Sequence, residues 1–229
     1  MRKYRHEIKY VISKRMAEIL KQRLLLIMDV DANSSNIDNT YLIRSLYFDD
    51  INNTAYYEKI DGVEFRKKYR IRIYNYDDSF IRLECKYKHN NMTSKDQYRI
   101  DKNTYENIVK GNLNELEISN NKMFNNFILD LKLKSLKPTV IVDYKRLALT
   151  YPISDVRVTF DSCISSGVYN YDLFDKNTNN LSIIDDDNIV LEVKYNEILP
   201  ESIAIILSTI PSVRESFSKF AYCSVVKEW

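Results

Sequence analysis

Basic and acidic side chains recur at every second position in several short stretches of this sequence. In residues 68–72, Lys68, Arg70 and Arg72 alternate with tyrosine and isoleucine. Side chains at positions i and i+2 of a β-strand lie on one face, so each such stretch predicts a strand with a charged face and an apolar face. The charged positions of the other stretches are Arg5, Glu7 and Lys9; Arg82, Glu84, Lys86 and Lys88; Arg146 beside Tyr144; Arg157 and Asp161; and Glu192 and Lys194.

Faces of this composition are suited to binding phosphate. An arginine guanidinium holds phosphate oxygens in pairs, and a lysine supplies a point charge. Arg70 and Arg72 would emerge about 6.5–7 Å apart on one face, which suits neighbouring phosphates of a single chain. A carboxylate together with Mg²⁺ or Mn²⁺ suits phosphoryl transfer. The carboxylates that would also offset part of the positive charge are Glu7, Glu84, Asp161 and Glu192.

The composition excludes several other classes of site. Three scattered glycines cannot form a glycine-rich phosphate loop, so any phosphate must be bound by side chains. Two histidines are too few for a histidine-based metal site, and three widely spaced cysteines predict neither a disulfide framework nor a zinc site. A net charge of +2 does not mark a nucleic-acid binder. Reduced thiols, with no signal peptide and no long apolar run, predict a cytoplasmic protein.

The elements that must position these residues are mostly strands. We expect one domain over residues 1–229, of the α+β class and mainly β. Any single charged face is also consistent with a solvated surface, but the same pattern in about eight strands favours a barrel with a charged bore and an apolar outside covered by helices. Strands are predicted at 3–12, 45–48, 68–74, 80–88, 96–100, 139–150, 156–161 and 190–195. Helices are predicted from the Ser13 cap to about Met28, from Thr104 to about Lys110, over 123–134, after Pro200 and near the C-terminal Lys219.

Eight short motifs in a fixed order give the chain a family resemblance. They are HEIKY (6–10), SLYFDD (45–50), YRIRIY (69–74), LECKYK (83–88), VDYKR (142–146), VRVTFD (156–161), LEVKY (191–195) and SKF (218–220). Together they span nearly the whole chain. In this respect the sequence resembles the VTC family, the catalytic domain of the vacuolar transporter chaperone complex and its bacterial relatives, which are triphosphate tunnel metalloenzymes.

The resemblance implies a closed antiparallel eight-stranded tunnel barrel with helices packed on the outside, and a polyphosphate polymerase that transfers the γ-phosphate of ATP to a growing polyphosphate chain with the help of Mn²⁺ or Mg²⁺. It implies Glu192 as the metal ligand. Strand parity adds Glu84 as a weaker second candidate, because it places this side chain on an inward face. Arg5 and Arg44 are further candidates for lining the bore. The residues implied to act on phosphate are Lys9, Arg70, Arg72, Lys86, Arg146, Arg157 and Lys219, accompanied by Lys95, Arg99, Tyr144, Lys194 and Ser218.

Two other functions remain open on the sequence. The same bore would serve a hydrolase of tripolyphosphate or nucleoside triphosphates, or a non-catalytic polyphosphate-binding module. A single-stranded nucleic-acid binder is disfavoured, because the shared faces carry charges rather than the aromatic side chains that stack on bases. By family analogy, the partners would be ATP, polyphosphate and a membrane protein docked at one tunnel mouth, which would place the chain in the cytoplasm or at the inner face of a membrane.

Overall fold

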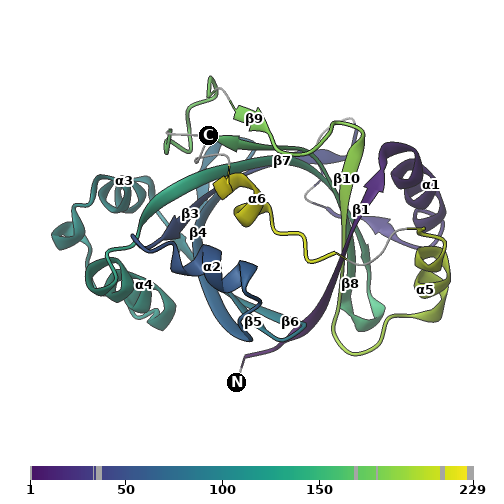
Figure 1. Cartoon of the computed structure of the whole chain (residues 1–229), viewed down its shortest axis with the longest axis horizontal. Helices are drawn as coiled ribbons and strands as arrows, with labels where there is room; N and C mark the ends of the chain where they lie inside the picture. The colour runs from purple at the N-terminus through teal and green to yellow at the C-terminus, as the bar shows by residue number, and fades with distance from the viewer. Residues whose placement is uncertain are drawn as a thin grey trace.

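A closed ring of antiparallel strands dominates the computed structural model, which describes residues 2–32, 34, 38–167, 170–178, 180–211 and 215–225. Within these residues, eight strands pair around the ring in the order β7-β3-β4-β5-β6-β1-β10-β8, and β8 pairs with β7 to close it (Figure 1). Their bounds are β1 (Arg5–Ser13), β3 (Thr40–Asp49), β4 (Phe65–Tyr74), β5 (Asp77–His89), β6 (Met92–Ile100), β7 (Lys137–Tyr151), β8 (Val156–Gly167) and β10 (Asn188–Tyr195). The short strand β2 (Asp29–Val30) pairs with the C-terminal end of β7, and the short strand β9 (Asn180–Ser182) pairs with the C-terminal end of β8.

Each of the eight predicted strands corresponds to one strand of the ring. The predicted closed antiparallel tunnel is therefore confirmed, and most strands extend a few residues beyond the predicted limits. The alternation of side chains also holds. In β4, Lys68, Arg70 and Arg72 face the interior of the ring, whereas Tyr69 and Ile71 belong to a buried apolar cluster outside it.

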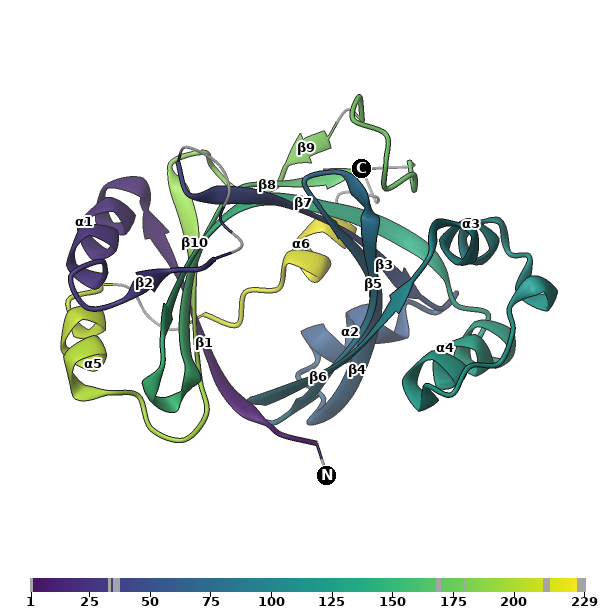
Figure 2. The same cartoon turned by 180° about the vertical axis from the view of Figure 1, so that it is seen from behind.

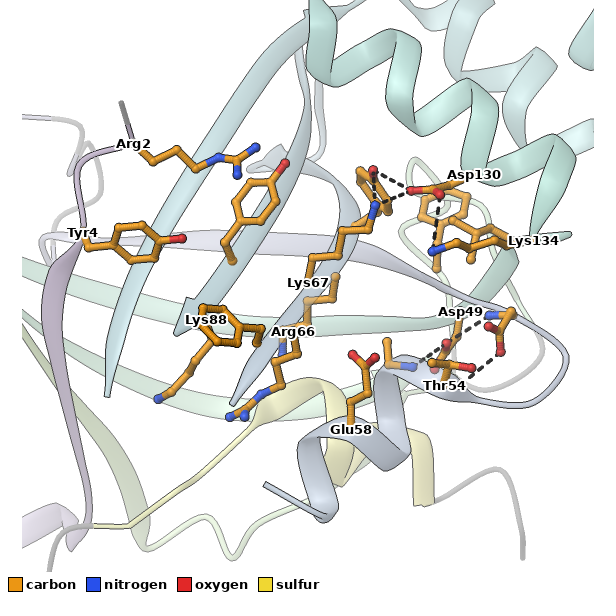
Figure 3. A pocket seen from close by; sticks show the side chains of 18 residues that line it. Arg2, Tyr4, Asp49, Thr54, Glu58, Arg66, Lys67, Lys88, Asp130 and Lys134 are labelled. Atoms are coloured by element: carbon orange, nitrogen blue, oxygen red, sulfur yellow. Dashed lines mark hydrogen bonds and ion pairs between the residues drawn. The ribbon is translucent and has the colours of Figure 1, made fainter. Parts of the chain in front are cut away.

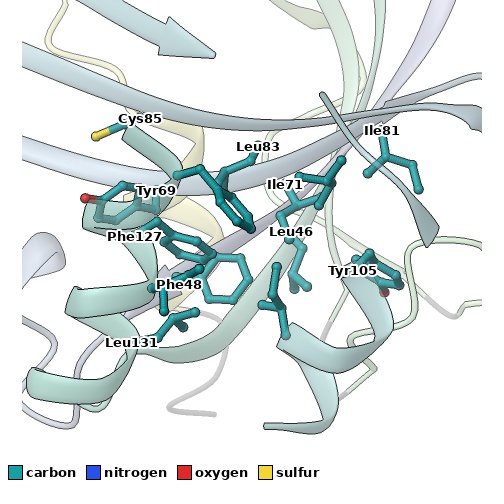
Figure 4. Packing of buried hydrophobic residues seen from close by; sticks show 14 of the residues in the cluster. Leu46, Phe48, Tyr69, Ile71, Ile81, Leu83, Cys85, Tyr105, Phe127 and Leu131 are labelled. Atoms are coloured by element: carbon teal, nitrogen blue, oxygen red, sulfur yellow. The ribbon is translucent and has the colours of Figure 1, made fainter. Parts of the chain in front are cut away.

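Helices cover the apolar outer face of the ring on two opposite sides (Figures 1 and 2). On one side, α3 (Lys102–Lys110) and α4 (Lys122–Leu133) pack on β3, β4 and β5, and Figure 4 shows Phe127 and Leu131 of α4 beside Phe48 and Tyr69 of the strands. On the other side, α1 (Lys14–Leu24) and α5 (Glu201–Ser208) form a second apolar cluster with β8 and β10. Short 3₁₀ turns occur at Leu113–Glu115 and Ile153–Asp155.

Local hydrogen bonds explain where the outer helices begin. The Ser13 hydroxyl accepts a hydrogen bond from the Met16 amide at 3.2 Å, as expected for an N-cap. The α1 helix ends at Leu24 rather than near Met28, because residues 25–27 form turns. The predicted cap of α3 is wrong by three residues: the Asp101 carboxylate accepts from the Thr104 amide at 2.7 Å, so Asp101 is the cap.

Two helices lie close to the bore, and one of them was not predicted. The α2 helix (Thr54–Ile60) follows β3 and is held by two preceding aspartates instead of a cap of its own. The Asp49 carboxylate accepts from the amides of Ala55 (2.8 Å) and Tyr56 (3.0 Å), and Asp50 accepts from the Thr54 amide (3.0 Å). The α6 helix (Lys219–Val225) lies within the outline of the ring in both views (Figures 1 and 2).

The α6 helix gives one part of the bore an apolar filling. Phe220 and Cys223 are buried, and the segment before the helix adds the buried Phe217. These side chains form one cluster with inward-facing residues of β3, β7, β8 and β10, which include Tyr47, Val140, Val142, Ile164 and Val190. Part of the interior is therefore apolar, although a charged bore was expected. No helix among the described residues is long and apolar enough to cross a membrane.

Candidate active site

The remaining part of the bore contains a strongly basic cavity of about 200 Å³. Side chains from all eight ring strands and from the C-terminal segment around α6 line it. Two carboxylates line the cavity, Glu7 and Glu192. The cavity is also lined by twelve lysines and arginines, which are Arg5, Lys9, Lys68, Arg70, Arg72, Arg82, Lys86, Lys95, Arg146, Arg157, Lys194 and Lys219.

Most of the predicted site residues meet at this cavity. Arg5, which sequence parity placed on an inward face, also lines it. Segments more than 200 residues apart in sequence contribute to it, because β1 is the first strand of the ring and α6 is the last helix. The predicted residues that the structure brings together are Lys9, Arg70, Arg72, Lys86, Lys95, Tyr144, Arg146, Arg157, Glu192, Lys194, Ser218 and Lys219.

Arg44 and Arg99 lie away from the cavity. Arg44 is buried on the outer face of β3, where its guanidinium contacts the Asp143 carboxylate at 2.7 Å and donates to the Thr178 hydroxyl at 2.7 Å. The expectation that Arg44 lines the bore is therefore corrected, since strand parity directs it outward. Arg99 is exposed near the end of β6 and donates to the carbonyl of Ser79 at 2.8 Å.

Adjacent positions of β1 and β10 form the first charge network of the site. The strand register sets Lys9 opposite Glu192 and Glu7 opposite Lys194. The Lys9 ammonium lies 3.4 Å from a carboxylate oxygen of each glutamate, and Lys194 also contacts both glutamates. Lys86 of β5 reaches across to Glu7 at 2.7 Å. Two carboxylates thus sit among three ammonium groups, and all five line the cavity.

Burial and neighbouring charges shift the pKa values of this network in both directions. Those of Glu7, Glu192, Lys86 and Lys194 are lowered, whereas the two glutamates raise the pKa of Lys9 despite its burial. Burial opposes ionisation of Glu7 and Glu192, but the surrounding ammonium groups outweigh it and hold the pKa of both carboxyls well below the ordinary range. Burial lowers the pKa of Lys86 to about 8 despite its contact with Glu7. Lys95, on β6, has a pKa lowered to about 8 by burial in the same way, although Glu84 favours its charged form.

Two further carboxylates, Glu84 and Asp161, do not line the cavity but contact arginines that do. Glu84 lies 2.6 Å from Arg70, 2.7 Å from Lys95 and 3.9 Å from Arg72, and it is fully buried. Because Glu84 does not line the cavity, its position supports a role in orienting cations better than a role in binding a metal.

Asp161 holds the other side of the site in the same manner. It is fully buried and lies 2.6 Å from both Arg146 of β7 and Lys219 of α6. Tyrosine hydroxyls add neutral support, since Tyr47 accepts from Arg70 at 2.8 Å and Tyr144 accepts from Arg72 at 2.9 Å. The cations are therefore fixed in place before any ligand arrives, and this preorganisation favours binding of developing negative charge.

Three lining residues were missing from the predicted set although strand alternation marked them. Lys68 and Arg82 share their faces with predicted residues of β4 and β5. Glu7 was expected to offset charge, and the structure sets it beside Glu192 with Lys9 between them. The described part of the chain holds no group of three or more histidine, cysteine or acidic side chains placed to hold a metal ion. Mg²⁺ usually needs only one or two carboxylates together with substrate phosphates, so the Glu7–Glu192 pair fits such an ion.

Comparisons with known proteins agree with this geometry. A family model described as the VTC domain matches residues 4–226. No curated protein matches the chain. Among solved structures, a putative adenylyl cyclase from Hippeastrum, described as having a dominant triphosphatase activity, is similar with a TM-score of 0.58 at 14% identity, covering 99% of this chain and 97% of that one. Putative adenylate cyclases from Vibrio parahaemolyticus (TM-score 0.54, 10% identity, 98% and 99% covered) and Bacillus halodurans (0.53, 13%, 90% and 87%) share the fold.

Proposed function

The chain belongs to the VTC domain family and has the fold of the triphosphate tunnel metalloenzymes, and from this premise we propose that it is a polyphosphate polymerase that transfers the γ-phosphate of ATP to a growing polyphosphate chain. The observation that carries the proposal is the cavity inside the ring, where twelve cations meet two lining carboxylates. Such an excess of fixed positive charge in a narrow space suits a ligand made of consecutive phosphates.

The proposed reaction needs alignment and charge stabilisation more than it needs proton transfer. A terminal oxygen of the acceptor chain attacks the γ-phosphorus of ATP, the bond from that phosphorus to the β–γ bridging oxygen breaks, and ADP leaves. The attacking oxygen is already anionic, so no protein base has to remove a proton. Arg70, Arg72 and Arg146 would stabilise the charge on the transferring group, and their carboxylate and tyrosine partners hold them in position.

A divalent metal ion fits the same site. We propose that Glu192 holds Mn²⁺ or Mg²⁺ together with Glu7, since both carboxylates line the cavity and lie within contact distance of the same lysine. When bound, the ion would neutralise part of the charge on the phosphate oxygens. Lys9 and Lys194, which line the same cavity, would add positive charge beside the phosphates.

Hydrolysis of a triphosphate in the same cavity is the second candidate function, and the Hippeastrum neighbour described as a triphosphatase favours it. A hydrolase has to activate water, and a carboxylate acts as a general base most effectively when its pKa is near the working pH. The cations around Glu7 and Glu192 hold their pKa values well below that range. This favours an acceptor that is already ionised.

One incubation separates these functions. The protein is mixed with ATP and Mn²⁺, and the products are separated on a gel stained for polyphosphate, while free phosphate is measured in the same sample. Polymer together with ADP supports the polymerase. Free phosphate without polymer supports the hydrolase. Unchanged ATP, together with measurable binding of polyphosphate, supports a non-catalytic binding module.

The proposed partners are ATP and inorganic polyphosphate rather than nucleic acid. Family analogy alone supports a membrane protein docked at one mouth of the tunnel, with the chain in the cytoplasm at the inner face of that membrane. Purification of the chain from native membranes tests this part. A membrane protein that co-purifies in constant ratio would support it, and the absence of any such protein would count against it.

A further inference from the structure

A second group of basic side chains gathers where the bore opens beside α2. Lys59 of α2, Arg66 and Lys68 of β4, and Lys88 of β5 line a small cavity of about 90 Å³. We call these four residues the mouth cluster. The small cavity shares Lys68 and Lys86 with the central cavity, so the two spaces adjoin.

The mouth cluster differs from the central site in its partners. Inside the bore, most of the cations lie within 4.0 Å of a carboxylate, as Arg70, Lys86 and Arg146 do. In the mouth cluster, by contrast, no carboxylate among the described residues comes within 4.0 Å of any member. The nearest partners are neutral: Lys59 donates to the Ser216 hydroxyl (2.9 Å), Arg66 to the Val63 carbonyl (2.5 Å) and Lys68 to the Ser218 hydroxyl (3.4 Å). Glu7 and Glu215 also line the small cavity, but neither forms an ion pair with the cluster in the described part of the chain, and Glu7 pairs with Lys9, Lys86 and Lys194 instead.

This arrangement is electrostatically unfavourable until an anion arrives. Burial lowers the pKa of all four members, and the charges of neighbouring cations lower the pKa of Lys59 and Lys68 further, whereas the charge of Glu7 offsets part of the lowering at Lys88. Like charges in a partly buried position repel one another more strongly than in water. A bound polyanion would remove that repulsion, so the cluster has more to gain from an external anion than the paired cations of the bore.

The surroundings of the cluster form a path leading outward. A larger cavity of about 390 Å³ on the outer side shares Arg66, Lys67, Lys68 and Lys88 with the small one, and it adds Lys134. Figure 3 shows the Arg66 and Lys88 side chains extending in the same direction, across from Glu58 of α2. Three cavities therefore follow one another from the centre of the bore to the outer surface. The narrow middle section suits a chain of bare phosphates better than a chain that carries bases.

We propose that the mouth cluster is a second polyanion site, which holds the part of a phosphate chain that extends beyond the reacting end. Its identification with polyphosphate rests on the proposed function, whereas the site itself rests on four clustered cations without carboxylate partners. The chain would pass from Lys68 and Lys86 to Lys59, Arg66 and Lys88, and then into the outer cavity. The site would bind long chains more tightly than short ones, because a short ligand makes all its contacts in the central cavity and does not reach the mouth cluster.

Direct binding of two inorganic probes tests the proposal. The affinities of the full chain and of the triple variant Lys59→Gln, Arg66→Gln, Lys88→Gln are measured for tripolyphosphate and for long-chain polyphosphate, without nucleotide. We expect the triple variant to bind the long chain about 10- to 100-fold more weakly, since three partly buried charges are lost. Its affinity for tripolyphosphate should change by less than about twofold, because none of the three substituted residues lines the central cavity.

A matched control removes three positive charges elsewhere. Lys122, Lys132 and Lys176 are exposed and lie outside all three cavities of the path, so their change to glutamine tests bulk charge alone. If this control and the triple variant of the mouth cluster weaken the binding of long-chain polyphosphate equally, the proposal is overturned. Equal weakening of the short and the long probe would also overturn it, because the three residues would then act on the bore. No weakening of either probe would show that the cluster is not a site.

Two further measurements keep the result interpretable. If the triple variant melts at a much lower temperature than the parent chain, the single Lys88→Gln variant replaces it, with an expected loss of about threefold for the long chain only. Single-stranded RNA of similar charge is a third probe, and binding as tight as that of polyphosphate, lost in the same variant, would overturn the assignment to a phosphate chain. Because no nucleotide is present, a failure of polymer synthesis would not alter these outcomes.

Discussion

The two parts of the bore obey the same strand alternation and differ completely in chemistry. In one part, inward positions carry Lys9, Arg70 and Glu192, and the space between them is left as a cavity. In the other part, inward positions carry Val140 and Val190, and Phe217 together with Phe220 and Cys223 of α6 fills the space. An inward direction alone therefore does not make a position part of the site. An inward position belongs to the site only where the space beside it is left open for a ligand and is not occupied by other side chains of the chain.

The largest effect should come from the filled part. Phe220 is almost fully buried between α6 and the strands and packs against Tyr47 with ring centroids 5.1 Å apart. We expect Phe220→Ala to lower the free energy of unfolding by about 3–5 kcal/mol, measured by urea denaturation. Tyr222 on the same helix is 47% exposed, and its change to alanine should cost about 1 kcal/mol. Equal losses at the two positions would mean that α6 does not fill the bore.

In the open part, the largest effect is expected on turnover. Glu192→Gln removes a charged oxygen from the proposed metal site and changes the side-chain volume little. Turnover should fall by about 100-fold or more, and the remaining activity should need a higher Mn²⁺ concentration. Steady-state kinetics over a series of metal concentrations measures both. Turnover at the parent level under limiting metal would rule Glu192 out as a ligand.

An arginine substitution should separate the residues that line the cavity from those that do not. Arg70→Ala removes a charge-assisted contact of about 1.5–3 kcal/mol, which corresponds to a tenfold to 150-fold weaker binding of ATP. Arg99 belonged to the same predicted set but lies exposed outside the cavity, so Arg99→Ala should leave ATP binding within about twofold. Titration calorimetry compares the two variants. If both variants bind ATP equally well, the site does not end where the lining of the cavity ends.

The smallest effect concerns the lysines whose pKa is lowered to about 8, Lys86 and Lys95. Above that pH a growing fraction of each is neutral, and a bound polyanion restores the charge, so tripolyphosphate binding at pH 8.5 should take up protons. Affinity should fall as the pH rises through about 8–9. Calorimetry in buffers with different ionisation enthalpies measures the uptake, and Lys86→Gln should reduce it. Binding without proton uptake would show that these lysines keep their protons in the free protein.

The lowered pKa of Lys86 and Lys95 also makes the free energy of unfolding depend on pH. Between the lowered pKa near 8 and the ordinary value near 10.5, the unfolded chain binds more protons than the folded one at these two positions. Their contribution to the free energy of unfolding therefore rises with pH across this interval.

Strand alternation predicted the ring well because it is a local property. A period of two fixes which residues share a face, and closure follows when many faces carry the same kind of charge. Arg44 was misplaced because the predicted strand began at residue 45, whereas β3 begins at Thr40 and directs Arg44 outward. The residues of β7 near Val142 are apolar on both faces, so alternation alone could not show that one face meets α6.

Other parts of the site depend on contacts between distant segments. The α2 helix is capped by Asp49 and Asp50 of the preceding strand end, a pattern that the usual single-residue cap signal does not describe. The roles of Glu84 and Glu7 could not be distinguished from parity, since both were expected on inward faces. Only the strand register shows that Glu7 lies beside Glu192 and that Glu84 is enclosed by arginines and a lysine.

The pairing of β1 with β10 has a consequence for how this protein is made. Residues 6–13 pair along their whole length with residues 188–195, whereas β1 and β6 share only two pairs of residues. The first strand of the ring therefore waits for the last strand of the ring before its main edge is covered. At about 5–20 residues per second this wait is about 10–40 s, during which an unpaired strand edge is exposed. The ring thus cannot close before residues 188–195 have left the ribosome, and α6 follows them in the chain.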